Sequence, residues 1–221
     1  IGDDGTDMKF IRLADDGLFA GAENTVSFWI SPLDWEGTKD GFLFLFGAAT
    51  PENSGFRIYK YTGDGGFLWF LVGNRQGTVT AMQEVFARIN DWKPGEWHHI
   101  AVTYRPGGRT FIGKESRQRI YLDGKLAGEK GIPEEMQPTV FPATWTIGPA
   151  ERWGAATVAS SAIDEWKVFA RELSPEEVKA EYLRLYTPKA GQPGRLAAGF
   201  RDAAAAPFDA EFARFAGGGN L

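Results

Sequence analysis

The sequence predicts an all-β protein whose antiparallel strands form a sandwich or barrel, with one short helix near the C-terminal end. Short runs of apolar and β-branched residues alternate with turn residues up to about residue 170. The turn signals recur at intervals typical of a sandwich or barrel, and no strand–helix–strand rhythm is present. With 221 residues, of which 43% are hydrophobic and 14% aromatic, the chain can bury a sizeable core.

Five strands are expected in the first part of the chain, and two of them are apolar on both faces. FLFLF (Phe42 to Phe46) and FLWFLV (Phe67 to Val72) carry no polar residue, which is typical of central strands covered on two sides. The others are expected in MKFIRLA and FRIYKY, which alternate apolar with polar residues, and in TVSFWIS, which is β-branched and aromatic.

Five more strand-forming segments are expected in the second part of the chain. They lie in TVTAMQEVFARI, WHHIAVTY, RIYLDGKLAGE, TWTIG and IDEWKVFARE. Within RIYLDGKLAGE, Asp123-Gly124 is a strong signal for a two-residue hairpin turn. A turn at this point makes the segments on its two sides neighbouring antiparallel strands.

One helix is expected in SPEEVKAEYLRLY, directly after the last strand. Ser174 is a suitable N-cap, Pro175 suits the first helical position, and Glu177 completes a capping box. The apolar residues of this segment share one face, so we expect the helix to pack on the sandwich. They are Val178, Tyr182 and Leu185.

The composition changes after Tyr186, which divides the chain into two parts. We expect residues 1–186 to form one domain, and residues 187–221, rich in Ala, Gly and Pro, to form a tail or an inter-domain linker. This tail is expected either to be disordered or to dock through its phenylalanines. They are Phe200, Phe208, Phe212 and Phe215.

The net charge and the missing residue types exclude several classes of function. The net charge is −5 and no basic stripe is present, so no nucleic-acid partner is expected. No apolar stretch approaches ~20 residues, so no membrane-spanning helix is expected. Cysteine is absent, which excludes disulfides, thiol catalysis and Cys-ligated zinc. The chain begins at Ile1 without a signal peptide, so we expect a fragment of a larger protein.

The two histidines, His98 and His99, are neighbours in the expected strand WHHIAVTY. Side chains alternate along a strand, so these two point to opposite faces and cannot bind one metal together. No G-x-S-x-G setting supplies a nucleophile for a histidine base. We therefore interpret them as hydrogen-bonded, partly buried structural residues.

Four segments, in order, resemble the laminin-G-like, concanavalin A-like jelly-roll family. TVSFWISP is similar to its strand FTVSFWVKP, and WKPGEWHHIAVTYRPGG to its W-x-HVAVTYDG strand, with His99 at the matching histidine. RIYLDGKLAGE is similar to its LYVDGKLV hairpin, and IDEWKVFARELSPEEVKAEY to its closing strand and helix, IDEVRIYNRALSxxEI. The resemblance covers most of residues 1–186. It implies a jelly-roll sandwich of two antiparallel sheets with six or seven strands each, one of them concave.

The resemblance also implies a range of functions. Members are usually secreted or cell-surface modules of larger proteins; many bind sugars, some bind proteins, and a related branch hydrolyses glycosides. We therefore expect a secreted or cell-surface binding module, attached to other domains of a larger chain, with a glycan ahead of a protein as its ligand. The fold alone does not choose among these functions.

A calcium ion near the rim of the sandwich is a further implication of the resemblance. Members hold it with the N-terminal segment and with the Asp of the IDE motif. The matching positions are Asp164 and the segment GDDGTD, in which Asp4 or Asp7 is the expected ligand. Calcium takes such carboxylates together with carbonyls and water. Solvated turn aspartates are the alternative interpretation.

A glycoside hydrolase of the same fold is the first alternative function. Such an enzyme needs two carboxylates that flank the glycosidic bond, and glucanases of this fold carry an E-x-D-x-x-E strand. That spacing does not occur in the sequence. Asp164 and Glu165 are adjacent, so on a strand they face opposite ways. We therefore favour a non-catalytic module and keep a protein-contact scaffold as the second alternative.

Tryptophans in expected loops are the candidates for ligand binding. A sugar has an apolar C–H face and a ring of hydroxyls, which a flat aromatic ring and polar side chains complement. Trp153 with Arg152 is the best candidate, followed by Trp35 and Trp92; alternatively, each covers an edge of the sandwich. The tryptophans in expected strands are interpreted as core residues. They are Trp29, Trp69, Trp97, Trp145 and Trp166.

The segment 105–118, before the hairpin, is longer than the family's usual turn and is rich in basic residues. It is either a flap that contacts an acidic glycan or a partner domain, or a solvated extension of a hairpin, and we favour the second interpretation. The basic residues in or next to it are Arg105, Arg109, Lys114, Arg117 and Arg119.

Overall fold

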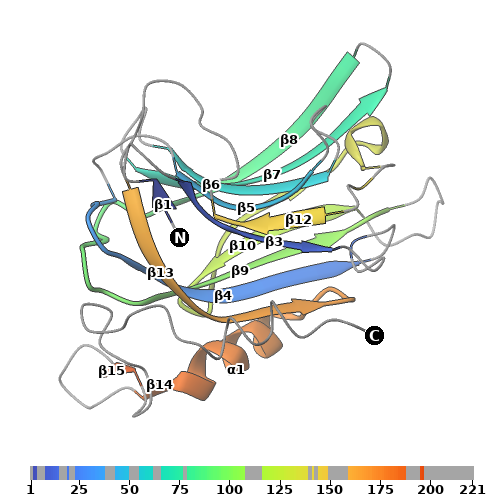
Figure 1. The fold of residues 1–221 in the computed structure, drawn as a ribbon. Helices are drawn as coiled ribbons and strands as arrows, with labels where there is room; N and C mark the ends of the chain where they lie inside the picture. The colour runs from blue at the N-terminus through green and yellow to red at the C-terminus, as the bar shows by residue number, and fades with distance from the viewer. Residues whose placement is uncertain are drawn as a thin grey trace, which may run out of the picture.

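The computed structural model consists of two antiparallel sheets that face each other and one helix that lies outside them (Figure 1). The predicted all-β sandwich with a short C-terminal helix is confirmed. No helix among the described residues is long and apolar enough to cross a membrane. The structure describes residues 2–3, 8–14, 19, 23–37, 43–49, 55–61, 66–76, 79–107, 116–138, 141, 144–148, 159–187 and 195–196.

The first sheet has seven strands in the order β11-β10-β9-β4-β13-β1-β2. Strand β4 lies between β9 and β13, which are far from it in the sequence, as the crossovers of a jelly roll require. The strands are β1 (Gly2–Asp3), β2 (Met8–Lys9), β4 (Asn24–Pro32), β9 (His98–Arg105), β10 (Arg117–Leu122), β11 (Lys125–Gly131) and β13 (Ala159–Phe169).

The second sheet has six strands in the order β3-β12-β5-β6-β7-β8. Its consecutive strands β5 to β8 form a meander, and β12 joins this meander to β3. The strands are β3 (Ile11–Ala14), β5 (Leu43–Ala49), β6 (Gly55–Tyr61), β7 (Phe67–Gln76), β8 (Val79–Arg88) and β12 (Thr144–Ile147). The 3-10 helix η1 (Glu134–Met136) contacts β7 and β8.

The hydrophobic core fills the space between the two sheets, where alternate residues of each strand point inward. Aromatic rings from both sheets meet there; for example, the centroids of Phe56 on β6 and Tyr104 on β9 are 4.7 Å apart. Trp145 and Trp166 belong to this core, as predicted. The fully buried aromatic residues of the core include Phe19, Phe28, Phe46, Phe56 and Phe70.

The predicted hairpin joins β10 to β11 at Asp123-Gly124. Both residues adopt the positive φ that a type I′ turn needs, 49° at Asp123 and 72° at Gly124. A Cβ atom at Gly124 would lie 3.0 Å from the Cδ1 atom of Tyr182, so the turn also requires glycine for the close approach of the helix.

The predicted helix is α1 (Pro175–Leu185), and its capping box is formed in both directions. The Ser174 N–H donates to the Glu177 carboxylate over 2.8 Å, and the Glu177 N–H donates to Ser174 Oγ over 3.2 Å. Val178 is fully buried and Tyr182 stacks on Trp29, so the helix packs on the outer face of the seven-stranded sheet as predicted.

After the helix, the structure describes only one short feature. Strand β14 (Tyr186–Thr187) pairs with β15 (Arg195–Leu196). The rest of the predicted tail, including its four phenylalanines, lies outside the described residues.

Candidate functional site

Strand β7 has two apolar faces, and only one of them belongs to the core. Leu68, Phe70 and Val72 point inward and are part of the main core cluster. The alternate residues, Phe67 and Trp69, therefore point out of the sandwich, away from the seven-stranded sheet. The prediction that Trp69 is a core residue is wrong, because FLWFLV is apolar on a face that the core does not use.

The strand register extends this outward face over the whole six-stranded sheet. Paired residues share a face, so each residue opposite an outward one also points outward. We call this surface the open face. Among residues with described side chains, it is formed by Arg12, Gly47, Arg57, Tyr59, Phe67, Trp69, Leu71, Met82, Glu84, Phe86, Arg88 and Thr146.

Three aromatic residues form a row across the open face, which we call the aromatic row. Tyr59 on β6 is opposite Trp69 on β7, which is opposite Phe86 on β8. The rings of Tyr59 and Trp69 are parallel within 5°, with centroids 6.3 Å apart, and Trp69 and Phe86 have centroids 5.0 Å apart. Strands lie about 4.8 Å apart, so the row is a continuous aromatic surface across three strands.

Part of the aromatic row is accessible to solvent. Phe86 is 48% exposed, and Met82, on the same face of β8 beyond Glu84, is 44% exposed. Phe67 is buried on the same face, with its ring centroid 5.1 Å from that of Phe86. Large apolar side chains exposed on one face of a rigid sheet are typical of an interaction surface.

Hydrogen bonding fixes one end of the aromatic row. The Tyr59 hydroxyl donates to the Glu84 carboxylate over 2.7 Å, across the intervening strand β7. The indole nitrogen of Trp69 is buried and has no hydrogen-bond partner within the described part of the chain. The tyrosine held by a carboxylate therefore supplies the polar groups beside the apolar surface of the aromatic row.

The outer face of the seven-stranded sheet is built differently, because residues 170–185 pack on it. We call it the covered face; its members include Ser27, Trp29, His99, Ala101 and Tyr121. Leu173 and Val178 form a small second core with Ala101 and Tyr121, and Tyr182 stacks on Trp29 with centroids 5.6 Å apart. This face is filled by the protein's own chain (Figure 1).

His99 lies in the covered face, where its Nε2 atom is 2.9 Å from Ser27 Oγ. Burial lowers the pKa of His99 to about 4, although Asp123 and Glu181 oppose this shift. His98 points the other way and stacks on Trp92, with centroids 4.1 Å apart. Both histidines therefore have packing and hydrogen-bonding roles, in agreement with the interpretation from the sequence.

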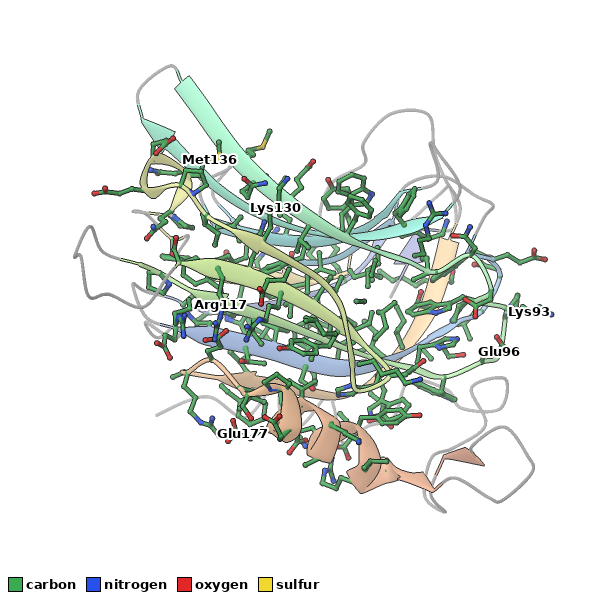
Figure 2. All side chains as sticks on the ribbon, turned by 180° about the vertical axis from the view of Figure 1, so that it is seen from behind. Lys93, Glu96, Arg117, Lys130, Met136 and Glu177 are labelled. Atoms are coloured by element: carbon green, nitrogen blue, oxygen red, sulfur yellow. The ribbon has the colours of Figure 1, made fainter. Side chains whose placement is uncertain are left out.

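Glu172 is the centre of an ion-pair cluster at the edge of the covered face. Its side chain is 6% exposed and lies within ion-pair distance of Arg105, Arg117 and Arg119. Arg117 binds it with two hydrogen bonds, of 2.7 and 2.9 Å, which raise the pKa of Arg117 further. Figure 2 shows Arg117 beside the segment that leads into α1.

The basic segment before the hairpin is therefore used in part for internal ion pairs. Arg105, Arg117 and Arg119 hold Glu172, and Arg119 also pairs with Glu129. These three arginines are not a solvated extension, which corrects the favoured interpretation for them. Arg109 and Lys114 lie outside the described residues.

Two of the predicted ligand-binding tryptophans lie in the core. Trp35 is 1% exposed and donates its indole N–H to Ser161 Oγ over 3.0 Å, and Lys60 Nζ lies 4.9 Å from the centre of its ring. Trp92 is 3% exposed and packs between Trp35 and His98. Neither ring presents a face to solvent, so the structure gives them packing roles.

The other predicted site residues fall mostly outside the described residues. Arg152, Trp153, Asp4 and Asp7 all lie there, and their predictions stay untested. Asp164 is described: it is exposed, and its Oδ1 atom accepts the N–H of Glu165 over 2.7 Å. Within the described part of the chain, no group of three or more His, Asp or Glu side chains is arranged to hold a metal.

The open face was missed from the sequence, although signals for it are present. FRIYKY, FLWFLV and MQEVFAR each place an aromatic residue on the face opposite the core positions, namely Tyr59, Trp69 and Phe86. Their alignment in one row depends on the strand register, which a single strand does not reveal.

The comparisons with known proteins agree with this architecture. The family model described as the concanavalin A-like lectin/glucanases superfamily matches residues 4–179. A comparison with curated proteins gives no match.

Among solved structures, receptor-binding domains of botulinum neurotoxins share the fold. The serotype C1 binding domain matches with a TM-score of 0.63 and 17% identity, over 84% of this chain and 43% of that one. A type C structure, whose title reports that cell entry depends on interaction with two ganglioside molecules, matches with a TM-score of 0.63 and 17% identity, over 83% and 42%. The DC binding domain in complex with rat synaptotagmin II matches with a TM-score of 0.62 and 16% identity, over 83% and 42%. The chain thus spans less than half the length of each of these domains.

Proposed function

The chain belongs to the concanavalin A-like lectin/glucanase superfamily, and from this premise we propose that it is a non-catalytic carbohydrate-binding module that binds a glycan on the open face. The observation that carries the proposal is the aromatic row of Tyr59, Trp69 and Phe86 on a rigid sheet, in which Phe86 is exposed and the other two rings are partly exposed. Trp35 and Trp92, which the sequence favoured, are buried and have no part in this surface.

The chemistry of the aromatic row fits a sugar. The apolar C–H face of a pyranose packs on aromatic rings, and its hydroxyls need hydrogen-bond partners at the edge of the contact. The Glu84 carboxylate and the Tyr59 hydroxyl supply polar groups beside the rings. The strands fix the backbone beneath these groups, so little ordering is needed when a ligand binds.

The structural neighbours add limited support for a glycan ligand. For one of them, interaction with two ganglioside molecules is reported, and gangliosides carry sugar head groups. That neighbour is more than twice as long as the part matched here, so the support concerns the class of ligand and not the position of the site.

Catalysis would require a second carboxylate. Glycosidases use a pair that flanks the scissile bond, and Glu84 is the one carboxylate among the residues that define the open face. Its Oε1 atom also accepts the Tyr59 hydroxyl. These observations favour binding without hydrolysis, and incubation of any bound glycan with the protein tests this directly, because released sugar would reveal an enzyme.

A glycan array followed by calorimetric titration of the best ligand tests the proposed function. Trp69→Ala and Phe86→Ala are expected to weaken binding roughly tenfold or more, because each removes part of the aromatic row. Leu126→Ala is the matched control, since Leu126 is 50% exposed but lies on β11 of the other sheet. If no glycan binds, or if binding is equal in all three variants, the open face is not a glycan site and a protein-contact role gains weight.

Calcium binding and a secreted or cell-surface location stay part of the proposal. Asp164, with Asp4 or Asp7, is the proposed ligand set, supported only by the resemblance of these positions to the family's motif. A thermal melt in chelator and in excess calcium tests it, because an ion that binds only the native state must raise the midpoint. An unchanged midpoint would rule this site out.

A further inference from the structure

We infer that the glycan bound by the open face is a linear chain that carries carboxylates, such as a polyuronate, and that arginines of this face recognise it. This inference rests on the proposed function, which supplies the aromatic row. It adds the class of sugar and the residues that select it.

Arg88 is the first of these arginines. It lies on β8, opposite Phe67, and its guanidinium carbon is 5.2 Å from the centre of the Phe67 ring. The residue is exposed, and no ion pair within the described part of the chain includes it. Phe67 thus holds the Arg88 guanidinium at the end of the aromatic row without a carboxylate partner.

Arg12 repeats this arrangement at the opposite edge of the sheet. It lies on β3, is exposed, and has its guanidinium carbon 5.4 Å from the centre of the Phe10 ring. Other described arginines are held by carboxylates: Arg117, Arg171 and Arg184 each form an ion pair with a glutamate. Two exposed arginines that stack on phenylalanine in place of a carboxylate are therefore distinctive of the open face.

Arg57 lies between these two, on β6. The register places Arg57, Leu71 and Glu84 in one row, the aromatic row next to it, and Phe67 with Arg88 on the far side. The aromatic row thus has Arg88 on one side, and a chain lying over the three rings would pass within reach of it.

The charge of the open face opposes that of the whole chain. The chain has a net charge of −5, yet the described side chains of the open face include three arginines and one carboxylate, Glu84. Glu84 is engaged by the Tyr59 hydroxyl. A positive face on an acidic protein attracts anionic ligands and favours their orientation toward it.

Carboxylate is the anion that suits these groups. The planar guanidinium forms two parallel hydrogen bonds to a carboxylate, and its stacking on a ring leaves its edge available for them. The arginines are several strands apart; from β3 to β6 the spacing is about 14 Å, more than one sugar unit. Such spacing requires charges that repeat along an extended chain, as in a polyuronate.

Matched pairs of oligosaccharides test the inference. The probes are oligomers of polygalacturonate, alginate and hyaluronate, each used as the free acid and as its methyl ester, which removes the charge and keeps the sugar backbone. At low salt we expect at least one acid to bind. Its methyl ester should bind at least about tenfold more weakly. Arg88→Gln and Arg12→Gln should each remove part of this preference, whereas Lys125→Gln, on exposed β11, should not.

The outcomes separate this inference from the proposed function. Equal binding of acid and ester, lost in Trp69→Ala, would overturn the carboxylate inference and keep the aromatic site. Binding of neutral glycans alone would also overturn the carboxylate inference and keep the aromatic site. Binding of the acid that survives Trp69→Ala and Phe86→Ala would contradict the proposed function, because charge alone would then hold the ligand. An acid preference unchanged in both arginine variants would overturn the assignment of these residues.

Discussion

The two outer faces of the sandwich are formed in the same way, but the chain's own helix segment covers only one of them. Both are formed by the alternate residues of antiparallel strands, and both carry large aromatic side chains. On the covered face, Trp29 is 2% exposed beneath Tyr182 of α1. On the open face, Phe86 is 48% exposed. The helix segment covers Trp29 on the first face, whereas Phe86 on the second face stays in contact with solvent.

This difference concerns what completes each face. The covered face is completed by the chain itself, with a second small core and the ion pairs of Glu172. Its residues should therefore matter for the free energy of unfolding. On the open face the ring of Phe86 is half-exposed, so its removal should change the free energy of unfolding little, and a role in binding is the proposal to test. Substitutions on the two faces should separate stability from binding.

The largest expected effect on stability is at Glu172. Glu172→Gln removes the carboxylate, 6% exposed, that three arginines surround, and with it the ion pair of Arg117. We expect a loss of roughly 3 to 5 kcal/mol in the free energy of unfolding, because breaking a buried pair leaves uncompensated charge. Chemical denaturation measures it.

Glu129→Gln is the matched control for Glu172→Gln. Glu129 also pairs with Arg119, but its side chain is 44% exposed, so its loss should cost less than about 1 kcal/mol. Equal losses in the two variants would mean that the Glu172 cluster does not anchor the covered face.

The second largest effect should appear as a dependence of stability on pH. The folded-state pKa of His99 is about 4, below its ordinary value of 6.5, because burial disfavours the charged ring. Between about pH 4 and pH 6.5, this histidine is therefore protonated in the unfolded chain but not in the folded chain. Stability should fall as the pH drops from about 6.5 to about 4, by at most about 3 kcal/mol, and this contribution should level off below pH 4.

His99→Gln isolates this effect, since glutamine does not titrate and can still hydrogen-bond Ser27. We expect the variant to be less stable at neutral pH but to show a flatter profile between pH 6.5 and pH 4. Any slope left in the variant belongs to carboxylates such as Glu181, whose pKa is lowered by the hydrogen bond from Lys167 in spite of burial. Identical slopes in both proteins would show that His99 is hydrated in the folded state.

A smaller loss is expected when the helix loses its contact with the covered face. Tyr182→Ala removes the ring that stacks on Trp29 and packs against Gly124, and should cost about 2 kcal/mol. Leu183→Ala, the neighbouring residue at 44% exposure, should cost less than about 0.5 kcal/mol. Denaturation of both variants gives the difference, and equal values would mean that α1 does not pack through Tyr182.

The covered face was largely predictable from the sequence, because its signals are local. The capping box at Ser174, the apolar spacing of Val178 and Tyr182, and the Asp123-Gly124 turn each fix a local geometry. The alternation around His99 also gave its face correctly. Together these signals predict the strands, the hairpin and the helix that packs on them.

The open face depends on register, which no single segment encodes. The sequence shows that Tyr59, Trp69 and Phe86 lie in different strands, but not that the three are opposite one another. Position in a loop was also misleading for Trp35 and Trp92, because the loops that carry them fold back into the core. Exposure is a property of the assembled sandwich, and a residue's place in a strand or loop does not determine it.

A small effect on stability, and the largest difference between stability and binding, should occur at Phe86. Phe86→Ala removes a half-exposed ring, so the free energy of unfolding should fall by less than about 1 kcal/mol. Phe70→Ala, on the inward side of the adjacent strand β7 and 2% exposed, should cost roughly 3 to 5 kcal/mol. Denaturation and glycan titration of the same Phe86→Ala sample complete the comparison. A stable variant with weakened binding places Phe86 in the binding surface, whereas a loss of stability near that of Phe70→Ala would mean that the open face is part of the core after all.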